Sequence, residues 1–447
     1  MSTQVSARRN RELRLLVLAL IIGAGALILV ALARNENQIA VPVPYFAIVA
    51  AGYVAAHFVT RRFAAQADPA LLPIAAVLNF LGLAAIFRLS PKDLGPLQIT
   101  WTLIGLACYI VTVIALRDYR TLARYKYILG FIGVGLLLLP MAPVVGAEIN
   151  GAQLWVRLGP LSFQPGELAK ICLVVFFAAY LAERKELLAY ASRRVAGLHV
   201  PDLKHFGPLL VMWGLSLAVM FFEKDLGSSL LFFSIFLVML YIATARFVYM
   251  AVGGVLFGVG AYFGYQMFSH VQTRVSSWLN VFDPKLIDNE SYQLAQSLFA
   301  LATGGLFGTG LGLGRPDLIP AAHTDFIFSV IGEELGLLGT AGILVCFMLM
   351  VARGLRTSLS AREDFPQLLS AGLTIIFAIQ TVIILAGVTR LMPLTGITLP
   401  FMSYGGSSLL SNFILIGVLI RVSHQTSAAP TPAHTAEILI GAPPKAD

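Results

Sequence analysis

Twelve separate stretches of this sequence are apolar and long enough to cross a lipid bilayer, and this feature constrains the fold more than any other. A bilayer core needs about 20 apolar residues per helix. The stretches occupy 15–33, 42–60, 69–87, 98–116, 127–144, 166–182, 207–222, 229–245, 247–268, 326–351, 368–388 and 400–420. They are too long for strands and lack the alternation of a barrel. We therefore predict an all-α polytopic membrane protein with about 12 transmembrane helices.

The charged residues support this class and predict an orientation. Only 12% of residues are charged, against about 25% in soluble domains, which argues against a soluble enzyme, a nucleic-acid-binding domain and a disordered scaffold. With the N-terminus in the cytoplasm, roughly two thirds of the 31 basic residues fall on cytoplasmic segments, as the positive-inside rule requires. The net charge of +8 therefore indicates topology, with both termini cytoplasmic, and does not indicate a nucleic-acid partner.

The order of these stretches predicts four regions. They are a cytoplasmic N-terminus (1–14), a first group of five helices (15–145), a core (146–422) and a disordered tail rich in Ala, Pro and Thr (423–447). Within the core, a large extracytoplasmic loop (269–325) joins the ninth and tenth helices. Its Gly-dense run, 304–314, predicts tight turns or a close approach of the backbone to a ligand. Ala31–Ala33 resembles a signal-peptidase site, but the long apolar run before it favours a retained helix.

Several ionisable side chains lie in or beside the apolar stretches, where they are costly. Glu167 and Lys170 share a helix face at i,i+3 spacing, so they form either a structural ion pair or a cation site for an anionic lipid headgroup. Asp225 either caps the next helix or lines an outer cavity. Asp325 likewise either caps the tenth predicted helix or lies at the mouth of an outer cavity, where it would act as a general base.

Two further features of the core have more than one interpretation. Glu333 and Glu334 lie about two turns beyond Asp325, and a structural network is favoured there over a proton path. The run LPFMSYGGSS over 399–408 interrupts an apolar stretch, which requires burial in protein or the lining of a cavity. The three cysteines have no spacing typical of a disulfide framework or zinc site. No cofactor is evident, although a divalent cation shared by Asp225 and Asp325 stays open.

Taken together, these segments resemble the SEDS family of membrane proteins. The motifs that carry the resemblance are GAQLWVRLG (151–159), QPGELAK (164–170), DLGSS (225–229), HTDFIF (323–328), GEELG (332–336) and LPFMSYGGSS (399–408). The resemblance implies a SEDS-type fold with two extra N-terminal helices. It also implies a peptidoglycan glycosyltransferase that polymerises lipid II at the outer face of the plasma membrane, beside a class B penicillin-binding protein transpeptidase and among membrane lipids.

The resemblance also assigns candidate site residues. The essential acidic residue of the family falls on Asp325, which we expect to act as the general base. Substrate contacts are expected from polar and aromatic residues of these motifs and of the large outer loop. The motifs contribute Trp155, Arg157, Glu167, Lys170, Asp225, His323, Ser403 and Tyr404, and the loop contributes Arg274 and Gln293.

Three alternatives to this function are compatible with the sequence. The first is a lipid II flippase, which would need polar sites deep in the membrane and on its inner side. The second is a non-catalytic scaffold. The third is an FtsW-like division polymerase; the short C-terminal tail favours the RodA-like elongation branch.

Overall fold

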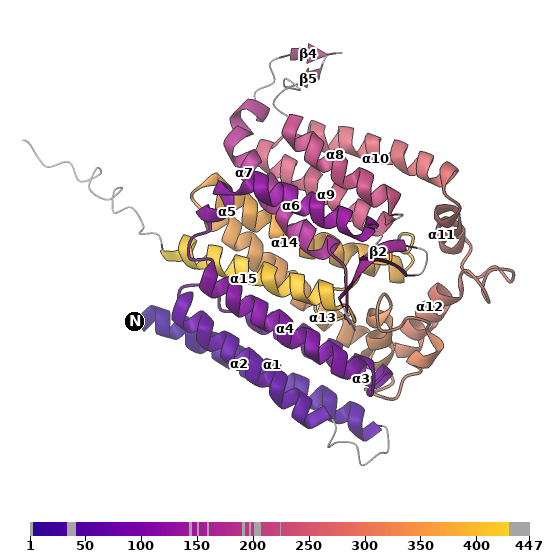
Figure 1. Ribbon diagram of the computed structural model, residues 1–447. Helices are drawn as coiled ribbons and strands as arrows, with labels where there is room; N and C mark the ends of the chain where they lie inside the picture. The colour runs from indigo at the N-terminus through magenta and orange to yellow at the C-terminus, as the bar shows by residue number, and fades with distance from the viewer. Residues whose placement is uncertain are drawn as a thin grey trace, which may run out of the picture.

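The computed structural model describes residues 3–33, 42–142, 145–149, 152–158, 161–189, 193–195, 198–200, 207–223 and 225–428. Its long helices lie roughly side by side (Figure 1). They are α1 (Thr3–Ala33), α2 (Pro42–Phe63), α3 (Leu71–Leu89), α4 (Leu94–Ala115), α6 (Lys126–Leu138), α7 (Gly166–Ala189), α8 (Gly207–Phe222), α9 (Leu226–Thr244), α10 (Phe247–Met267), α13 (Ile327–Ser360), α14 (Asp364–Val388) and α15 (Gly406–Ala428).

These helices confirm the prediction of an all-α polytopic membrane fold, because each predicted stretch overlaps one of them. The last stretch was predicted to begin at residue 400, and the helix begins at Gly406. Within the described residues, nine helices have the length and hydropathy of a membrane span. Two apolar helices are shorter, Lys126–Met141 and Gly207–Ala218. Helix α7 carries ionisable residues near both ends. Helix α15 continues to Ala428, six residues into the predicted tail, and residues 429–447 lie outside the described part.

The connections contain more structure than the sequence predicted. A three-stranded antiparallel sheet is formed by β1 (Gly146–Ile149), β2 (Ala152–Leu158) and β3 (Leu161–Phe163). A hairpin of β4 (Arg193–Val195) and β5 (Leu198–Val200) follows α7. Short helices occupy the remaining loops, namely α5 (Arg120–Arg124), η2 (Leu139–Met141), α11 (Ser269–Leu279), α12 (Tyr292–Gly304) and η4 (Pro316–Leu318). The large loop 269–325 therefore contains two helices, α11 and α12.

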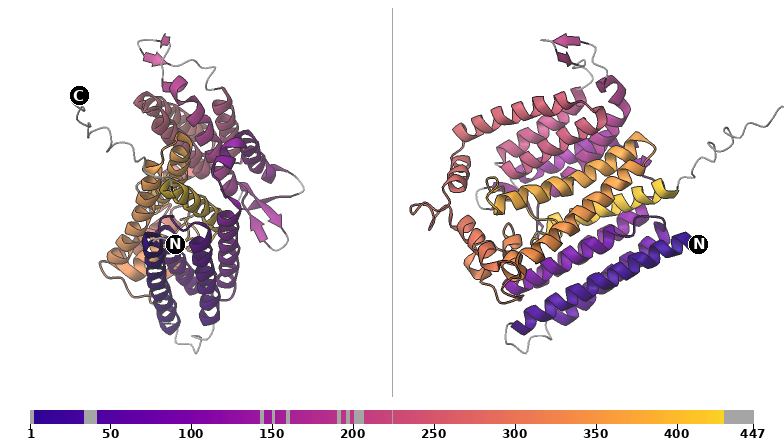
Figure 2. Two further views of the ribbon diagram at one scale, coloured as in Figure 1. Left: turned by 90° about the vertical axis from the view of Figure 1, so that its left-hand side faces the viewer. Right: turned by 180° about the vertical axis from the view of Figure 1, so that it is seen from behind.

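The helices form a layered bundle with two distinct edges (Figure 2). At one edge, α1 and α2 pack on α3 and α4. At the other, α10 packs on α9 and leaves most of its apolar side chains exposed, as a lipid-facing helix would. The centre consists of α13, α14 and α15 with α7 and α3, which bury most of the core.

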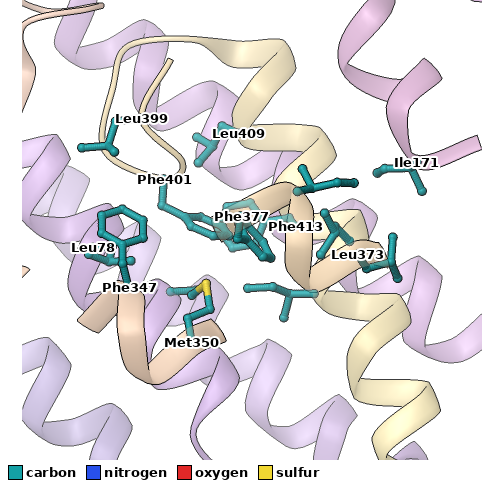
Figure 3. Packing of buried hydrophobic residues seen from close by; sticks show 14 of the residues in the cluster. Leu78, Ile171, Phe347, Met350, Leu373, Phe377, Leu399, Phe401, Leu409 and Phe413 are labelled. Carbon is teal, nitrogen blue, oxygen red and sulfur yellow. The ribbon is translucent and has the colours of Figure 1, made fainter. Parts of the chain in front are cut away.

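The irregular segment 399–405 is held in this core by Phe401. Its ring stacks on Phe377 of α14 at a centroid distance of 5.8 Å and meets Phe413 of α15 edge-on at 5.3 Å (Figure 3). Phe401 is buried and has a left-handed φ of 63°. Two buried amides bind the same backbone: Asn79 donates to the Phe401 carbonyl at 3.4 Å and Gln98 to the Ser403 carbonyl at 3.2 Å. The irregular backbone is thus buried in protein, one of the two environments the sequence required.

A fully buried ionic cluster fixes α1 to the rest of the bundle. The Glu12 carboxylate accepts from Arg9 and lies 2.6 Å from Nδ1 of His57 on α2, and all three side chains are 0% exposed. Arg9 also donates to the carbonyl of Ala67, in the turn between α2 and α3. Each buried charge therefore depends on its partner, since an unpaired ion in the interior is strongly unfavourable.

Replacement of Glu12 tests this cluster. Glu12→Ala should lower the free energy of unfolding by about 3–5 kcal/mol, because the Arg9 charge would remain buried without its carboxylate. Thermal unfolding in detergent measures the effect, with Glu186→Ala on the exposed surface of α7 as the control. Equal midpoints for the two variants would show that the cluster does not hold α1.

The Gly-dense segment packs closely against a break in α13, where its partner is backbone of the same chain; an approach to a ligand stays a prediction. Gly336 has φ 65° and ψ −167°, which interrupts the helical hydrogen bonds. The backbone of 305–310 replaces them: Thr309 N donates to the Glu333 carbonyl at 2.9 Å, and Leu337 N donates to the Gly305 carbonyl at 2.9 Å. Gly308, at φ 82°, lies so close to the Glu334 carbonyl that a Cβ would overlap it.

Gly308→Ala should therefore destabilise the fold by at least about 2 kcal/mol, since it adds left-handed strain to a collision with backbone. Gly342→Ala is the matched control, because its Cβ would enter open space on an exposed face of α13. The measurement is again the unfolding midpoint in detergent. An unchanged midpoint for Gly308→Ala would contradict the close packing.

Candidate functional site

Asp325 lies at the start of α13 without capping it. The helix begins at Ile327, and its N-cap residue is Phe326, which contributes no side-chain cap. Within the described residues, no hydrogen bond to the Asp325 carboxylate is found. The capping interpretation of Asp325 is therefore wrong, and its half-buried carboxylate has no structural role at the helix terminus.

Asp225 shows the opposite behaviour. It is the N-cap of α9, and its Oδ1 accepts the backbone N–H of Ser228 at 2.9 Å. This confirms the capping interpretation. Asp225 is also half-buried, and the charges of Arg274 and Glu167 both act on its pKa.

Arg274 of α11 and Asp325 meet at Gly396, in the loop between α14 and α15. A Cβ on Gly396 would lie 3.8 Å from Nη2 of Arg274 and 4.0 Å from Oδ2 of Asp325. Nη1 of Arg274 is held by the carbonyl of Thr395 at 3.3 Å. Gly396 has φ 78°, a conformation that glycine adopts without strain. The loop thus brings a guanidinium and a carboxylate to one face of a residue that has no side chain.

The surroundings of the two aspartates shift their protonation. Burial raises the pKa of Asp325 to about 6, and the nearby Arg274 guanidinium limits the rise. Burial also raises the pKa of Asp225, while the bond from Ser228 and the charge of Arg274 oppose that rise. A carboxylate with a pKa just below neutral is mostly ionised at pH 7 and can still accept a proton. Asp325 has the protonation behaviour of a general base.

The segment before Asp325 is fixed by the loop before α15. Ser403 Oγ donates to the carbonyl of Thr324 at 2.6 Å, and the Tyr404 N–H donates to the carbonyl of His323 at 2.7 Å. The His323 ring meets the Tyr404 ring edge-on at 5.6 Å, and burial lowers the pKa of His323, which favours the neutral ring. His323, Ser403 and Tyr404 therefore position the Asp325 backbone.

Glu167 and Lys170 form a buried network instead of an open cation site. Lys170 is 1% exposed and donates to Glu167 at 2.6 Å and to Gln380 of α14 at 3.0 Å. Ser411 of α15 donates to Glu167 at 3.0 Å, and Gln380 donates to the Thr398 carbonyl at 2.8 Å. This geometry is that of the structural ion pair.

Gln380 and Ser411 were missed by sequence reasoning, although both connect α7 to the helices that carry the loop. Gln380 had a detectable signal, because it is a lone amide within an apolar run of α14. Ser411 gave none, since a serine in a membrane helix commonly bonds its own backbone.

Three predicted site residues, Trp155, Arg157 and Gln293, make no contact with the Arg274–Asp325 pair through a hydrogen bond or ion pair among the described residues. Trp155 and Arg157 are on β2, where Arg157 is exposed and pairs in register with Ser162 of β3. Gln293 is exposed on α12. In the described part of the chain, no hydrogen bond or ion pair joins these three side chains to Asp325. Their assignment as substrate contacts stays a prediction.

The deep carboxylates belong to the helix break. Glu333 Oε1 accepts the N–H of Arg315 at 3.0 Å, Glu334 Oε2 accepts the N–H of Gly312 at 2.9 Å, and Arg88 lies 3.4 Å from Glu334. This confirms the favoured structural network. Among the described residues, no three His, Cys, Asp or Glu side chains converge as metal ligands.

Comparison with known proteins places this geometry in a family. The family model of FtsW, RodA and SpoVE, described as "Cell cycle protein", matches residues 69–428. The peptidoglycan glycosyltransferase RodA of Mycobacterium tuberculosis is 48% identical over 380 residues, which is 83% of this chain and 80% of that protein. A probable FtsW of Geobacter sulfurreducens is 34% identical over 72% of this chain and 83% of that protein.

Solved structures agree with this placement. A chain from a peptidoglycan synthase complex with coordinated polymerization and crosslinking aligns with a TM-score of 0.64 at 26% identity, covering 80% of this chain and 98% of that chain. The RodA of Thermus thermophilus aligns with a TM-score of 0.55 at 26% identity, covering 81% and 98%. With the family model covering most of its length, this chain belongs to the FtsW/RodA/SpoVE family.

Proposed function

We propose that this chain is a RodA-like peptidoglycan glycosyltransferase that polymerises lipid II, the undecaprenyl-linked disaccharide-peptide, during cell elongation. The observation that carries the proposal is the convergence of Asp325 and Arg274 on Gly396. Identity to RodA proteins is higher than to FtsW proteins, which favours the elongation branch. The site faces outward in the plasma membrane, with both termini cytoplasmic, as the basic residues predict.

The two groups divide the chemistry of glycosyl transfer between them. Asp325 takes the proton from the acceptor sugar hydroxyl, whose oxygen then attacks the anomeric carbon of the donor. The bond from that carbon to the pyrophosphate oxygen breaks at the same time. Arg274 stabilises the negative charge that develops on the leaving undecaprenyl pyrophosphate, as a fixed cation does in many transferases.

The proposal includes a transpeptidase partner of the class B penicillin-binding type. It is supported by the likeness to a chain from a complex in which polymerization and crosslinking are coordinated. The flippase alternative loses its main support, because Glu333 and Glu334 are engaged by backbone N–H groups and Arg88.

The decisive experiment incubates the purified protein with lipid II in detergent, with and without a class B penicillin-binding protein, in Mg²⁺ and in EDTA. Glycan polymer on a gel is the expected result, and detergent leaves no membrane across which a flippase could act. Activity in Mg²⁺ that EDTA removes would show that the reaction requires a divalent cation. Absence of polymer under every condition would refute the enzyme and favour a flippase or scaffold.

A further inference from the structure

A strongly basic cavity of about 490 Å³ opens at the end of the bundle that carries the N-terminus. It lies at the opposite end of α13 from Asp325, between the first turns of α1, the last turns of α13 and the end of α15. Figure 2 shows the N-terminal end of α1 beside the end of α15. The charged residues of its lining are Arg8, Arg11, Arg14, Asp68, Arg353 and Arg356.

The arginines of this cavity are largely uncompensated. Arg353 lies 3.5 Å from Asp68, and Arg8 donates to the carbonyl of Gln66 at 2.8 Å. Arg11, Arg14 and Arg356 are exposed, and within the described residues they have no hydrogen-bond or ion-pair partner. Five guanidinium groups thus share a single carboxylate, an arrangement that attracts a multivalent anion.

Hydrogen bonds and ion pairs hold the walls of the cavity together. The buried cluster of Arg9, Glu12 and His57 fixes α1. The turn between α2 and α3 is fixed to α15, because Gln66 N donates to His424 at 3.1 Å and Asp68 N donates to Ser423 Oγ at 3.0 Å. The lining also includes Thr426, whose hydroxyl donates to the Val422 carbonyl of its own helix at 2.9 Å. Guanidinium donors on a fixed frame bind phosphate oxygens through charge-assisted hydrogen bonds.

The cavity depends on a helix that the family match does not include. The match begins at residue 69, so α1, with Arg8, Arg11 and Arg14 at i,i+3,i+6 spacing, lies before it. The matched region supplies only Arg353 and Arg356 among the five arginines. Packing of α1 on α3 therefore creates a site that the matched region alone does not have.

We propose that this cavity binds a phosphate-bearing anion, with the headgroup of an anionic membrane lipid as its natural source. Arg14 directly precedes the apolar run of α1 that begins at Leu15, so the cavity lies at the depth where a helix leaves the hydrocarbon core. Anionic headgroups occupy that level, and basic side chains beside them interact favourably. The site is distinct from the Arg274–Asp325 pair and does not depend on the proposed catalysis.

The test measures lipid binding by the full chain in detergent. Short-chain phosphatidylglycerol is titrated and bound lipid is counted by native mass spectrometry, with phosphatidylcholine and inorganic pyrophosphate as separate arms. The triple variant Arg11→Gln, Arg14→Gln, Arg356→Gln should bind phosphatidylglycerol about a hundredfold more weakly, at about fivefold per arginine. The control, Arg117→Gln, Arg124→Gln, Arg184→Gln, removes the same charge from exposed positions away from the cavity and should bind as the natural chain does.

The outcomes separate the sources of the anion. Saturable phosphatidylglycerol binding that the cavity variant loses supports the lipid. Saturable pyrophosphate binding lost by the same variant, without phosphatidylglycerol binding, supports a soluble phosphate at the same site. The triple Arg→Lys variant keeps the charge and should retain binding within about fivefold, which excludes misfolding as the cause of a loss. Equal binding by the cavity and control variants, or equal binding of phosphatidylcholine, would overturn the proposal.

Discussion

Asp325→Asn should reduce kcat for glycan polymerisation by about 10²–10⁴-fold, the contribution of a positioned general base. Asparagine fills the same space and cannot take a proton from the acceptor hydroxyl. Because Asp325 caps no helix, its loss should leave α13 intact. The measurement is the rate of lipid II consumption by purified protein at saturating substrate.

The pH dependence of the polymerisation rate tests whether Asp325 is the base. Asp325 must be ionised to act as a base, and its pKa is about 6. The rate should therefore fall as pH drops through about 6 and level off at higher pH. Asp317→Asn is the matched control, because Asp317 is an exposed carboxylate eight residues away that pairs with Arg315 at 3.0 Å. Asp317→Asn should keep both the rate and the profile, and a similar rate for Asp325→Asn would refute the assignment.

The thermal stability of Asp325→Asn should change in the opposite direction to its activity. The folded-state pKa of Asp325 lies above its ordinary value of 3.8, so folding favours the protonated form. Protonation of Asp325 therefore stabilises the folded state. This contribution to the free energy of unfolding is fully present below pH 3.8 and is lost as pH rises through about 6. Asp325→Asn should therefore raise the unfolding midpoint at pH 8 and leave it almost unchanged at pH 4. A variant that is inactive and more stable has lost chemistry and kept its fold.

The helices were predictable because hydropathy alone requires them. Each apolar stretch must satisfy its backbone hydrogen bonds internally, and only a helix does so within one segment. The sheet of β1–β3 was not predictable, because its strands are short and gave no clear alternation. The Gly-dense segment was predicted to turn tightly or to approach a ligand. Its partner, the break at Gly336, appears only when 305–310 and 333–338 are placed side by side.

The site shows the same limit at the level of single side chains. Composition and motif placed Asp225 and Asp325 at equivalent positions before a helix, and both could have been caps. One hydrogen bond in the structure distinguishes the two residues: the Asp225 carboxylate accepts the backbone N–H of Ser228. The convergence of Arg274 with Asp325 depends on Gly396, from a third segment of the chain. Sequence spacing carries no information about such a meeting, so the candidate residues were predictable and their grouping was not.

Arg274→Ala should reduce kcat by about 10²–10³-fold, the effect of removing one preorganised electrostatic contact to a developing negative charge. It should also move the acidic limb of the pH profile to higher pH. The guanidinium holds down the pKa of Asp325, so its removal leaves burial unopposed and raises that pKa further. If Arg274 served only to hold the loop through the Thr395 carbonyl, its removal would not shift the acidic limb of the pH profile.

Arg274→Lys separates charge from geometry. A lysine restores the positive charge, so the limb should return toward its natural position. The rate should recover only in part, because an ammonium does not reproduce the planar fork that donates to the loop and faces Asp325 together. Lys285→Ala, an exposed cation in the same loop, is the control for net charge and should leave rate and profile unchanged. An unshifted limb in Arg274→Ala would show that the guanidinium does not act on Asp325, and would leave the leaving-group role to another cation.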